Sequence, residues 1–117
     1  RARLEHPGSY NLVAELDGVP VGMVSGIPTD DPLVSALISM WVAPSARGRG
    51  VGDALVGAVI AWARARGAVA LGLEVVATNE PAARLYLRNG FVFTGEVTER
   101  VPDGRREAAM RLPLAPG

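Results

Sequence analysis

Hydrophobic and polar positions along the first third of the chain predict three strands. The stretches from Tyr10 to Leu16 and from Val19 to Ile27 are predicted as strands. Asp17-Gly18 lies between them, and this dipeptide is typical of a two-residue hairpin because both turn positions need positive φ. After a loop with two prolines, Leu33 to Val42 is apolar enough for a strand that is buried on most of both faces.

The middle of the chain predicts two helices separated by a strand. Val51 to Arg66 is rich in alanine, carries apolar residues at helical spacing and is followed by Gly67, a typical helix end. Val69 to Val75 is predicted as a short apolar strand that contains one glutamate. Asn79 can cap a second helix that runs to Arg88.

The end of the chain predicts a second antiparallel pair. Phe91 to Val101 alternates as a strand, Pro102-Asp103-Gly104 is a turn, and Arg105 to Leu114 is the last strand. The strand–helix–strand centre implies a parallel pair with a right-handed crossover, whereas the flanking hairpins imply antiparallel edges. We therefore predict the α/β class, with a mixed, mostly antiparallel sheet around one central parallel strand pair, flanked by helices. Residues 1–117 are expected to form a single domain.

Composition and charge narrow the classes of function. Hydrophobic residues make up 49% of the 117 residues, which excludes a disordered chain. Twelve basic and twelve acidic residues give zero net charge, so we expect no nucleic-acid partner and no membrane partner. Cysteine is absent and His6 is the one histidine, so we expect no metal and no cysteine nucleophile. No apolar run is long enough to span a membrane and no signal peptide is visible, so we expect a cytoplasmic protein.

The segment Arg47-Gly48-Arg49-Gly50-Val51-Gly52 lies where a predicted strand leads into a helix. Glycines let a ligand approach the backbone, and a helix N-terminus offers unpaired amides and the positive end of its dipole. With two arginines, these features suit a pyrophosphate. The glycine spacing differs from a dinucleotide fingerprint, and a Walker A loop needs a lysine that the chain lacks. From the loop alone, a plain strand-to-helix turn and a phosphate-binding domain for another nucleotide remain alternatives.

Further along the chain, single residues admit both functional and structural interpretations. Glu74 interrupts an apolar strand, where a carboxylate costs desolvation energy unless it is paired or faces a cleft; the alternative is a strand face open to solvent. Asn79, Tyr86 and Gly90 can equally be a helix cap, a core aromatic residue and a helix end.

Four larger side chains carry plainer expectations. Trp41 and Trp62 are expected in the core rather than at a ligand. Arg84 and Arg88 lie on the second predicted helix and are expected to be solvated, although either could meet a phosphate.

Taken together, the motifs resemble the GNAT family of N-acetyltransferases. Arg47-Gly48-Arg49-Gly50-Val51-Gly52 fits the family signature Gln/Arg-x-x-Gly-x-Gly/Ala, and Asn79, Ala82, Leu85-Tyr86 and Gly90-Phe91 follow in the family's order. The resemblance covers nearly the whole chain from Tyr10 onward and implies a GNAT-like fold. Because that family opens with a strand and two helices, we expect those elements to be missing here or replaced by a partner chain.

The resemblance implies acetyl-CoA as a cofactor that is consumed as a cosubstrate. Backbone amides from Gly48 to Asp53 would hold the pyrophosphate, and Met40 to Val42 would pair with the pantetheine arm where the parallel strands splay apart. Asn79 would hold the cofactor near that splay. The implied cofactor-binding residues are Met40, Trp41, Val42, Arg47, Gly48, Arg49, Gly50, Val51, Gly52, Asp53 and Asn79.

The resemblance also implies two catalytic residues. Tyr86 would protonate the leaving thiolate. Leu73-Glu74-Val75, followed by Asn79 and Tyr86, is similar to the subgroup that acetylates the N-terminus of a ribosomal protein, which implies Glu74 as a general base acting through water. That subgroup has tyrosines after Phe91 that line a peptide groove, whereas the stretch from Val97 to Val101 has none.

The expected function is therefore transfer of an acetyl group from acetyl-CoA to a primary amine by direct attack. The acceptor, a small molecule or a protein N-terminus, is not identified by the residues. The alternative is a non-catalytic CoA-binding or interaction module with the same fold. We expect association into a homodimer through pairing of the last strands.

Overall fold

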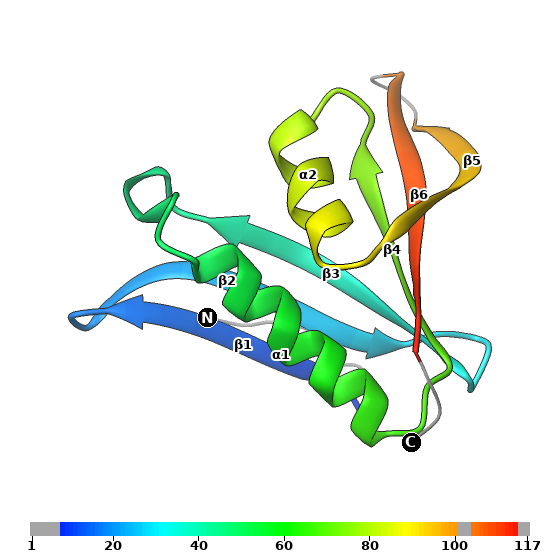
Figure 1. Ribbon diagram of the computed structural model, residues 1–117, viewed down its shortest axis with the longest axis horizontal. Helices are drawn as coiled ribbons and strands as arrows, with labels where there is room; N and C mark the ends of the chain where they lie inside the picture. Colours follow the sequence, from blue (N-terminus) through cyan, green and yellow to red (C-terminus); the bar gives the residue numbers. More distant parts are fainter. Residues whose placement is uncertain (1–7, 101–103, 115–117) are drawn as a thin grey trace.

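The computed structural model describes residues 8–100 and 104–114 (Figure 1). Its elements are β1 (Tyr10–Leu16), β2 (Val19–Pro28), β3 (Val34–Val42), a short 3-10 turn η1 (Pro44–Ala46), α1 (Val51–Ala65), β4 (Ala70–Val76), α2 (Glu80–Arg88), β5 (Val92–Arg100) and β6 (Arg105–Pro113). His6, Val101 and the turn expected at Pro102-Asp103 lie outside the described residues.

The six strands form one sheet in the order β1-β2-β3-β4-β6-β5. β3 and β4 are parallel, and the other neighbouring strands are antiparallel. The predicted fold class is therefore confirmed. α1 lies across the half of the sheet formed by β1 to β3, and α2 lies beside β4 (Figure 1).

Local turn chemistry sets most element ends. Asp17 and Gly18 have φ of 52° and 80°, as the hairpin prediction requires. α2 ends where the Phe91 amide donates to the Tyr86 carbonyl at 3.0 Å, a bond that closes the last helical turn. The last antiparallel pair therefore begins at Val92, one residue later than predicted.

A bulge in β3 reverses the facing of its last residues. Ser39 has φ of 59°, and the ladder with β2 shifts register between Met23 and Ser25. One extra residue exchanges the two faces of a strand from that point onward. The expectation of a core Trp41 is wrong for this reason: its side chain is 47% exposed, whereas Met40 packs against the core.

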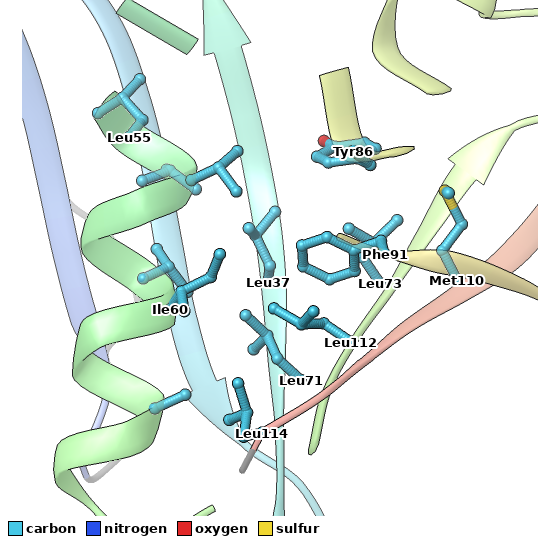
Figure 2. Close-up of a cluster of buried hydrophobic side chains, with 14 of the residues drawn as sticks. Leu37, Leu55, Ile60, Leu71, Leu73, Tyr86, Phe91, Met110, Leu112 and Leu114 are labelled. Atoms are coloured by element: carbon cyan, nitrogen blue, oxygen red, sulfur yellow. The ribbon is translucent and has the colours of Figure 1, made fainter. Parts of the chain in front are cut away.

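The core lies between the sheet and the helices, and its side chains come from α1, α2, β2, β3, β4 and β6 and from the segments that join or follow them (Figure 2). Phe91, Leu55, Leu71 and Met110 are its largest fully buried members. Burial of such side chains contributes roughly 1.5–3 kcal/mol each. These contacts hold α1 and α2 against the same face of the sheet.

Trp62 is held at the edge of this core, as expected. Its ring stacks on Tyr10 with 6.1 Å between centroids, and the Arg66 guanidinium lies 4.8 Å from the ring centroid. On the sheet side, a Cβ atom added to Gly26 would lie 2.6 Å from two ring atoms. Glycine at this position is therefore what lets the ring lie directly on β2.

The central parallel pair is short. β3 and β4 are aligned from Val34 opposite Ala70 to Ala36 opposite Gly72. Beyond that point the two strands diverge, with β3 running toward one side of the molecule and β4 toward the other (Figure 1). The carboxyl-terminal half of β3 is therefore not paired with β4.

Candidate active site

The diverging strands, the first turn of α1 and helix α2 line a cleft of about 1140 Å³. The cleft brings together every predicted site residue except Arg49. Those lining it are Met40, Trp41, Val42, Arg47, Gly48, Gly50, Val51, Gly52, Asp53, Glu74, Asn79 and Tyr86. Residues that are more than thirty positions apart in sequence are thus assembled at one place.

The N-terminus of α1 is open toward this cleft. Its first helical hydrogen bond runs from the Ala54 amide to the Gly50 carbonyl at 3.0 Å, so the amides of residues 51–53 precede the helical ladder. Gly50 occupies the N-cap position with φ of 79° and provides no side-chain cap. A Cβ atom added to Gly48 or Gly50 would meet nothing within 4 Å. The turn therefore offers amide donors and a positive dipole end to an anion.

Gly52 has a packing role that the sequence interpretation missed. A Cβ atom at this position would lie 3.2 Å from Leu85 Cδ2 and 3.6 Å from Met40 Cε. The third glycine of the loop therefore lets α2 and β3 approach α1 closely. Its role is distinct from that of Gly48 and Gly50, which border open space.

The free side of β3 supplies backbone groups to the same cleft. The Ala43 amide donates to the Val21 carbonyl of β2 at 2.7 Å. Because backbone groups of successive strand residues point to opposite sides, the amide and carbonyl of Val42 point away from β2. β4 has already diverged there, and Val42 lines the cleft. An extended ligand with amide groups could pair with this edge as a strand would.

Tyr86 presents a protonated hydroxyl to the cleft. The residue is 5% exposed, and its ring packs edge-on against Phe91 with 5.8 Å between centroids (Figure 2). Burial raises the pKa of Tyr86 to about 12, so the hydroxyl keeps its proton at neutral pH. Within the described residues no buried side-chain oxygen or nitrogen lacks a partner. Since the Tyr86 hydroxyl forms no hydrogen bond there, it must reach the open cleft.

Asn79 caps α2, as its ordinary interpretation predicted. Its Oδ1 accepts a hydrogen bond from the Ala82 amide at 3.2 Å. The residue also lines the cleft. Because Oδ1 already accepts in the cap, Nδ2 is the side-chain group of Asn79 that would contact a ligand, as a donor.

Glu74 lies where the cleft meets a second cavity of about 750 Å³. It is exposed on β4 between buried Leu73 and Val75, so its side chain projects from the sheet face that does not pack on the helices. The same face of β4 and β6 lines the second cavity. Glu74 is thus accessible from both cavities.

The second cavity contains charged residues that the sequence interpretation did not single out. Glu96 of β5 and Glu107 and Arg111 of β6 line it together with Glu74. The spacing of Glu107 and Arg111 along β6 puts both on one face of the strand, which is a signal that alternation alone could have revealed. The acidic loop at Asp30-Asp31 does not line either cavity.

A clamp of three side chains joins the first turn of α1 to the end of α2; we call it the Asp53–Arg88–Asn89 clamp. Arg88 donates from Nε to Asp53 Oδ1 at 3.0 Å and from Nη2 to Oδ2 at 2.8 Å. Asn89 Nδ2 donates to Asp53 Oδ1 at 2.9 Å. These bonds, above all those from Arg88, hold the pKa of the Asp53 carboxyl below its usual value. Arg88 is exposed, as expected, and its guanidinium also forms an ion pair that the sequence did not indicate.

Two further observations concern residues 8–100 and 104–114. No three His, Cys, Asp or Glu side chains are grouped there in a way that could hold a metal ion. No helix in that part of the chain is long and apolar enough to cross a membrane.

Comparison with known families decides the assignment. The model of the family described as "Acetyltransferase (GNAT) family" matches residues 1–91. The chain belongs to the GNAT acetyltransferase family. The nourseothricin acetyltransferase crystal structure, a GNAT fold neighbour, superposes with a TM-score of 0.85 at 35% identity, covering 93% of this chain and 67% of that one.

Other relatives of this GNAT chain carry different named substrates. Streptothricin acetyltransferase of Streptomyces lavendulae is 48% identical over 54 residues, covering 46% of this chain and 29% of that protein. A ribosomal-protein-alanine N-acetyltransferase structure from Brucella melitensis has a TM-score of 0.78 and 31% identity, over 92% of this chain and 70% of that chain. The chain spans between 29% and 64% of the length of the first curated relatives that it matches.

Proposed function

We propose that this GNAT protein transfers an acetyl group from acetyl-CoA to a primary amine by direct attack on the thioester. One observation carries the proposal. The open N-terminus of α1, the free edge of β3 at Val42 and the Tyr86 hydroxyl all border a single cleft. An anion site, a strand-like edge and a proton donor are the three features that a phosphorylated thioester with an amide-containing arm requires.

The cleft fits the cofactor in two parts. Amides of residues 48–53, at a turn with room above it, would bind the pyrophosphate. The backbone from Met40 to Val42 would pair with the amides of the pantetheine arm, and Asn79 would contact the arm from the start of α2. Acetyl-CoA supplies the acetyl thioester that reacts. The Val42 amide, which points into the splay, would polarise the thioester carbonyl as an oxyanion hole does.

Proton transfers assign roles to Glu74 and Tyr86. An alkyl amine with a pKa near 10.4 costs about 4.6 kcal/mol to deprotonate at pH 7, and an α-amino group with a pKa near 8 costs about 1.4 kcal/mol. Glu74 would take this proton through water while the nitrogen–carbon bond forms. As the carbon–sulfur bond breaks, Tyr86 would give its proton to the sulfur. Positioned acid and base groups typically contribute about 10²–10⁴-fold in rate.

The second cavity is the proposed entry for the acceptor. It approaches Glu74 from the side opposite the helices. Its carboxylates Glu74, Glu96 and Glu107 outnumber Arg111 and the Arg105 that pairs with Glu107 at 3.5 Å. This balance suits a cationic amine. The names of the relatives support testing streptothricin-type compounds first and a peptide with an N-terminal alanine second.

The deciding experiment is a calorimetric titration with acetyl-CoA beside ATP and NAD, followed by a thiol-release assay with a panel of amines. Micromolar binding of acetyl-CoA alone, with thiol release for at least one amine, supports the proposal. Binding without release for any amine favours a CoA-binding module, and binding of ATP or NAD instead favours another nucleotide. The cytoplasmic location, the single domain and the homodimer stay predictions, and sedimentation analysis tests the last.

A further inference from the structure

Asp53 creates a charge problem for the pyrophosphate site proposed above. It is the third residue of α1, beside the amides that precede the helical ladder, and it lines the cleft. A carboxylate in the first turn interacts favourably with the positive end of the helix dipole. The same carboxylate repels the negative charges of a pyrophosphate bound a few ångströms away.

Arg88 is placed to remove this repulsion. Both carboxylate oxygens of Asp53 accept from its guanidinium, at 3.0 and 2.8 Å, in the bidentate geometry that arginine favours. Asn89 adds a third donor to Asp53 at 2.9 Å and also donates to the Leu85 carbonyl at 2.8 Å, which fixes its amide. The clamp therefore has no net charge and keeps the carboxylate turned toward α2.

We propose that Arg88 supports cofactor binding indirectly, as a positioning residue that binds and neutralises Asp53 rather than as a phosphate ligand. The inference rests on the proposed function, because it concerns the site for the pyrophosphate of acetyl-CoA. A direct phosphate contact would require the guanidinium to share or leave the carboxylate that occupies Nε and Nη2. In the indirect role, what harms binding is the unpaired carboxylate and not the missing cation.

A double-mutant cycle separates the two roles. Acetyl-CoA affinity is measured by calorimetry for the parent, R88Q, D53N and the D53N/R88Q double variant. We expect R88Q to weaken binding at least tenfold, because it leaves the Asp53 carboxylate with the Asn89 hydrogen bond but without a positive partner beside the pyrophosphate. D53N removes the carboxylate but keeps the backbone amide of residue 53, so the double variant is expected to recover most of the affinity that R88Q loses. Restoration of affinity by a second substitution is a result that loss of packing would not produce.

R84Q provides the matched control. Arg84 lies one turn earlier on α2, lines the same cleft and pairs with Glu80 at 3.8 Å, so its loss changes the cleft charge equally. Its effect on affinity is expected to be the same with and without D53N. R84Q therefore shows how the loss of one positive charge changes acetyl-CoA affinity when the Asp53–Arg88 ion pair stays intact.

If the parent binds acetyl-CoA, three results would overturn the inference. In the first, R88Q weakens binding as strongly in the D53N background as in the parent, which would mean that Arg88 contacts the phosphates directly. The same assignment follows if D53N alone tightens binding by freeing the guanidinium. A double variant that melts like R88Q, yet binds no better than R88Q, would remove the charge explanation. A parent that binds no acetyl-CoA would refute the proposed function itself and the inference with it, whereas a binding parent with independent effects refutes the inference alone.

Discussion

Replacing Gly50 with alanine tests whether the turn before α1 is a ligand site or only a turn. Gly50 has φ of 79°, and an added Cβ atom would meet nothing within 4 Å. The cost to the fold therefore comes from the left-handed backbone alone, about 1–2 kcal/mol. At about 4 °C per kcal/mol for a domain of this size, Tm is expected to fall by about 4–8 °C.

The effect on affinity should be larger than strain alone explains. The new methyl group would occupy open space at a turn that lines the cleft, where the pyrophosphate is proposed to bind. Loss of one charge-assisted hydrogen bond, worth about 1.5–3 kcal/mol, weakens binding roughly 10- to 150-fold. Calorimetric titration with acetyl-CoA measures this change at a temperature well below both melting transitions.

Gly18 is a close control for Gly50. It has φ of 80°, and an added Cβ atom would likewise meet nothing within 4 Å, but it lies in the β1–β2 turn and does not line the cleft. G18A should lower Tm as much as G50A and leave acetyl-CoA affinity unchanged. If G50A binds as tightly as the parent, the pyrophosphate does not bind at this turn. If G18A weakens binding equally, the loss reflects general destabilisation.

Four other substitutions test the catalytic roles and the packing. Glu74→Gln should lower kcat/KM most at low pH, where the amine holds its proton; a pH–rate profile that matches the parent's excludes the base role. Tyr86→Phe should lower turnover but keep acetyl-CoA affinity, and because the pKa of Tyr86 is raised to about 12, the parent-to-variant rate ratio should be constant from about pH 6 to 10. A ratio that declines above neutral pH would mean that the hydroxyl loses its proton earlier and is not the acid described. Gly26→Ala places a Cβ atom 2.6 Å from Trp62 ring atoms and should lower the free energy of unfolding by about 1–3 kcal/mol, whereas Gly57→Ala, in open space, should raise it by about 0.4–1 kcal/mol. Urea titration checks this pair, and changes of the same sign in both variants would contradict the packing argument.

Features that depend on neighbouring residues were predictable from the sequence. The Asp17-Gly18 hairpin, the Asn79 cap and the helix end at Gly90 each depend on the conformational preference of one or two residues. The family motifs add the arrangement of these parts in space, and for that reason most of the predicted site residues lie in one cleft.

Features that depend on tertiary contacts were not predictable in the same way. The bulge in β3 is centred on Ser39, and serine rarely adopts positive φ, so nothing in the sequence indicated the bulge. The exposure of Trp41 was missed for that reason. Asp53 and Arg88 are 35 positions apart, and nothing in their local sequence indicates an ion pair. The second role of Gly52 depends on Leu85, which only the packing of α2 brings near.

The short alignment of β3 with β4 has a consequence for the stability of the whole molecule. The sheet consists of two antiparallel halves, β1-β2-β3 and β4-β6-β5, joined through three residues of each central strand. A pantetheine arm bound between the diverging strands would extend this junction, so the bound cofactor would hold the two halves of the sheet together. At a hundredfold excess over Kd, binding would add about 2.7 kcal/mol to the free energy of unfolding. Amide hydrogen exchange in β3 and β4 should then become slower as the concentration of acetyl-CoA rises. Resistance to proteolysis should increase in the same way.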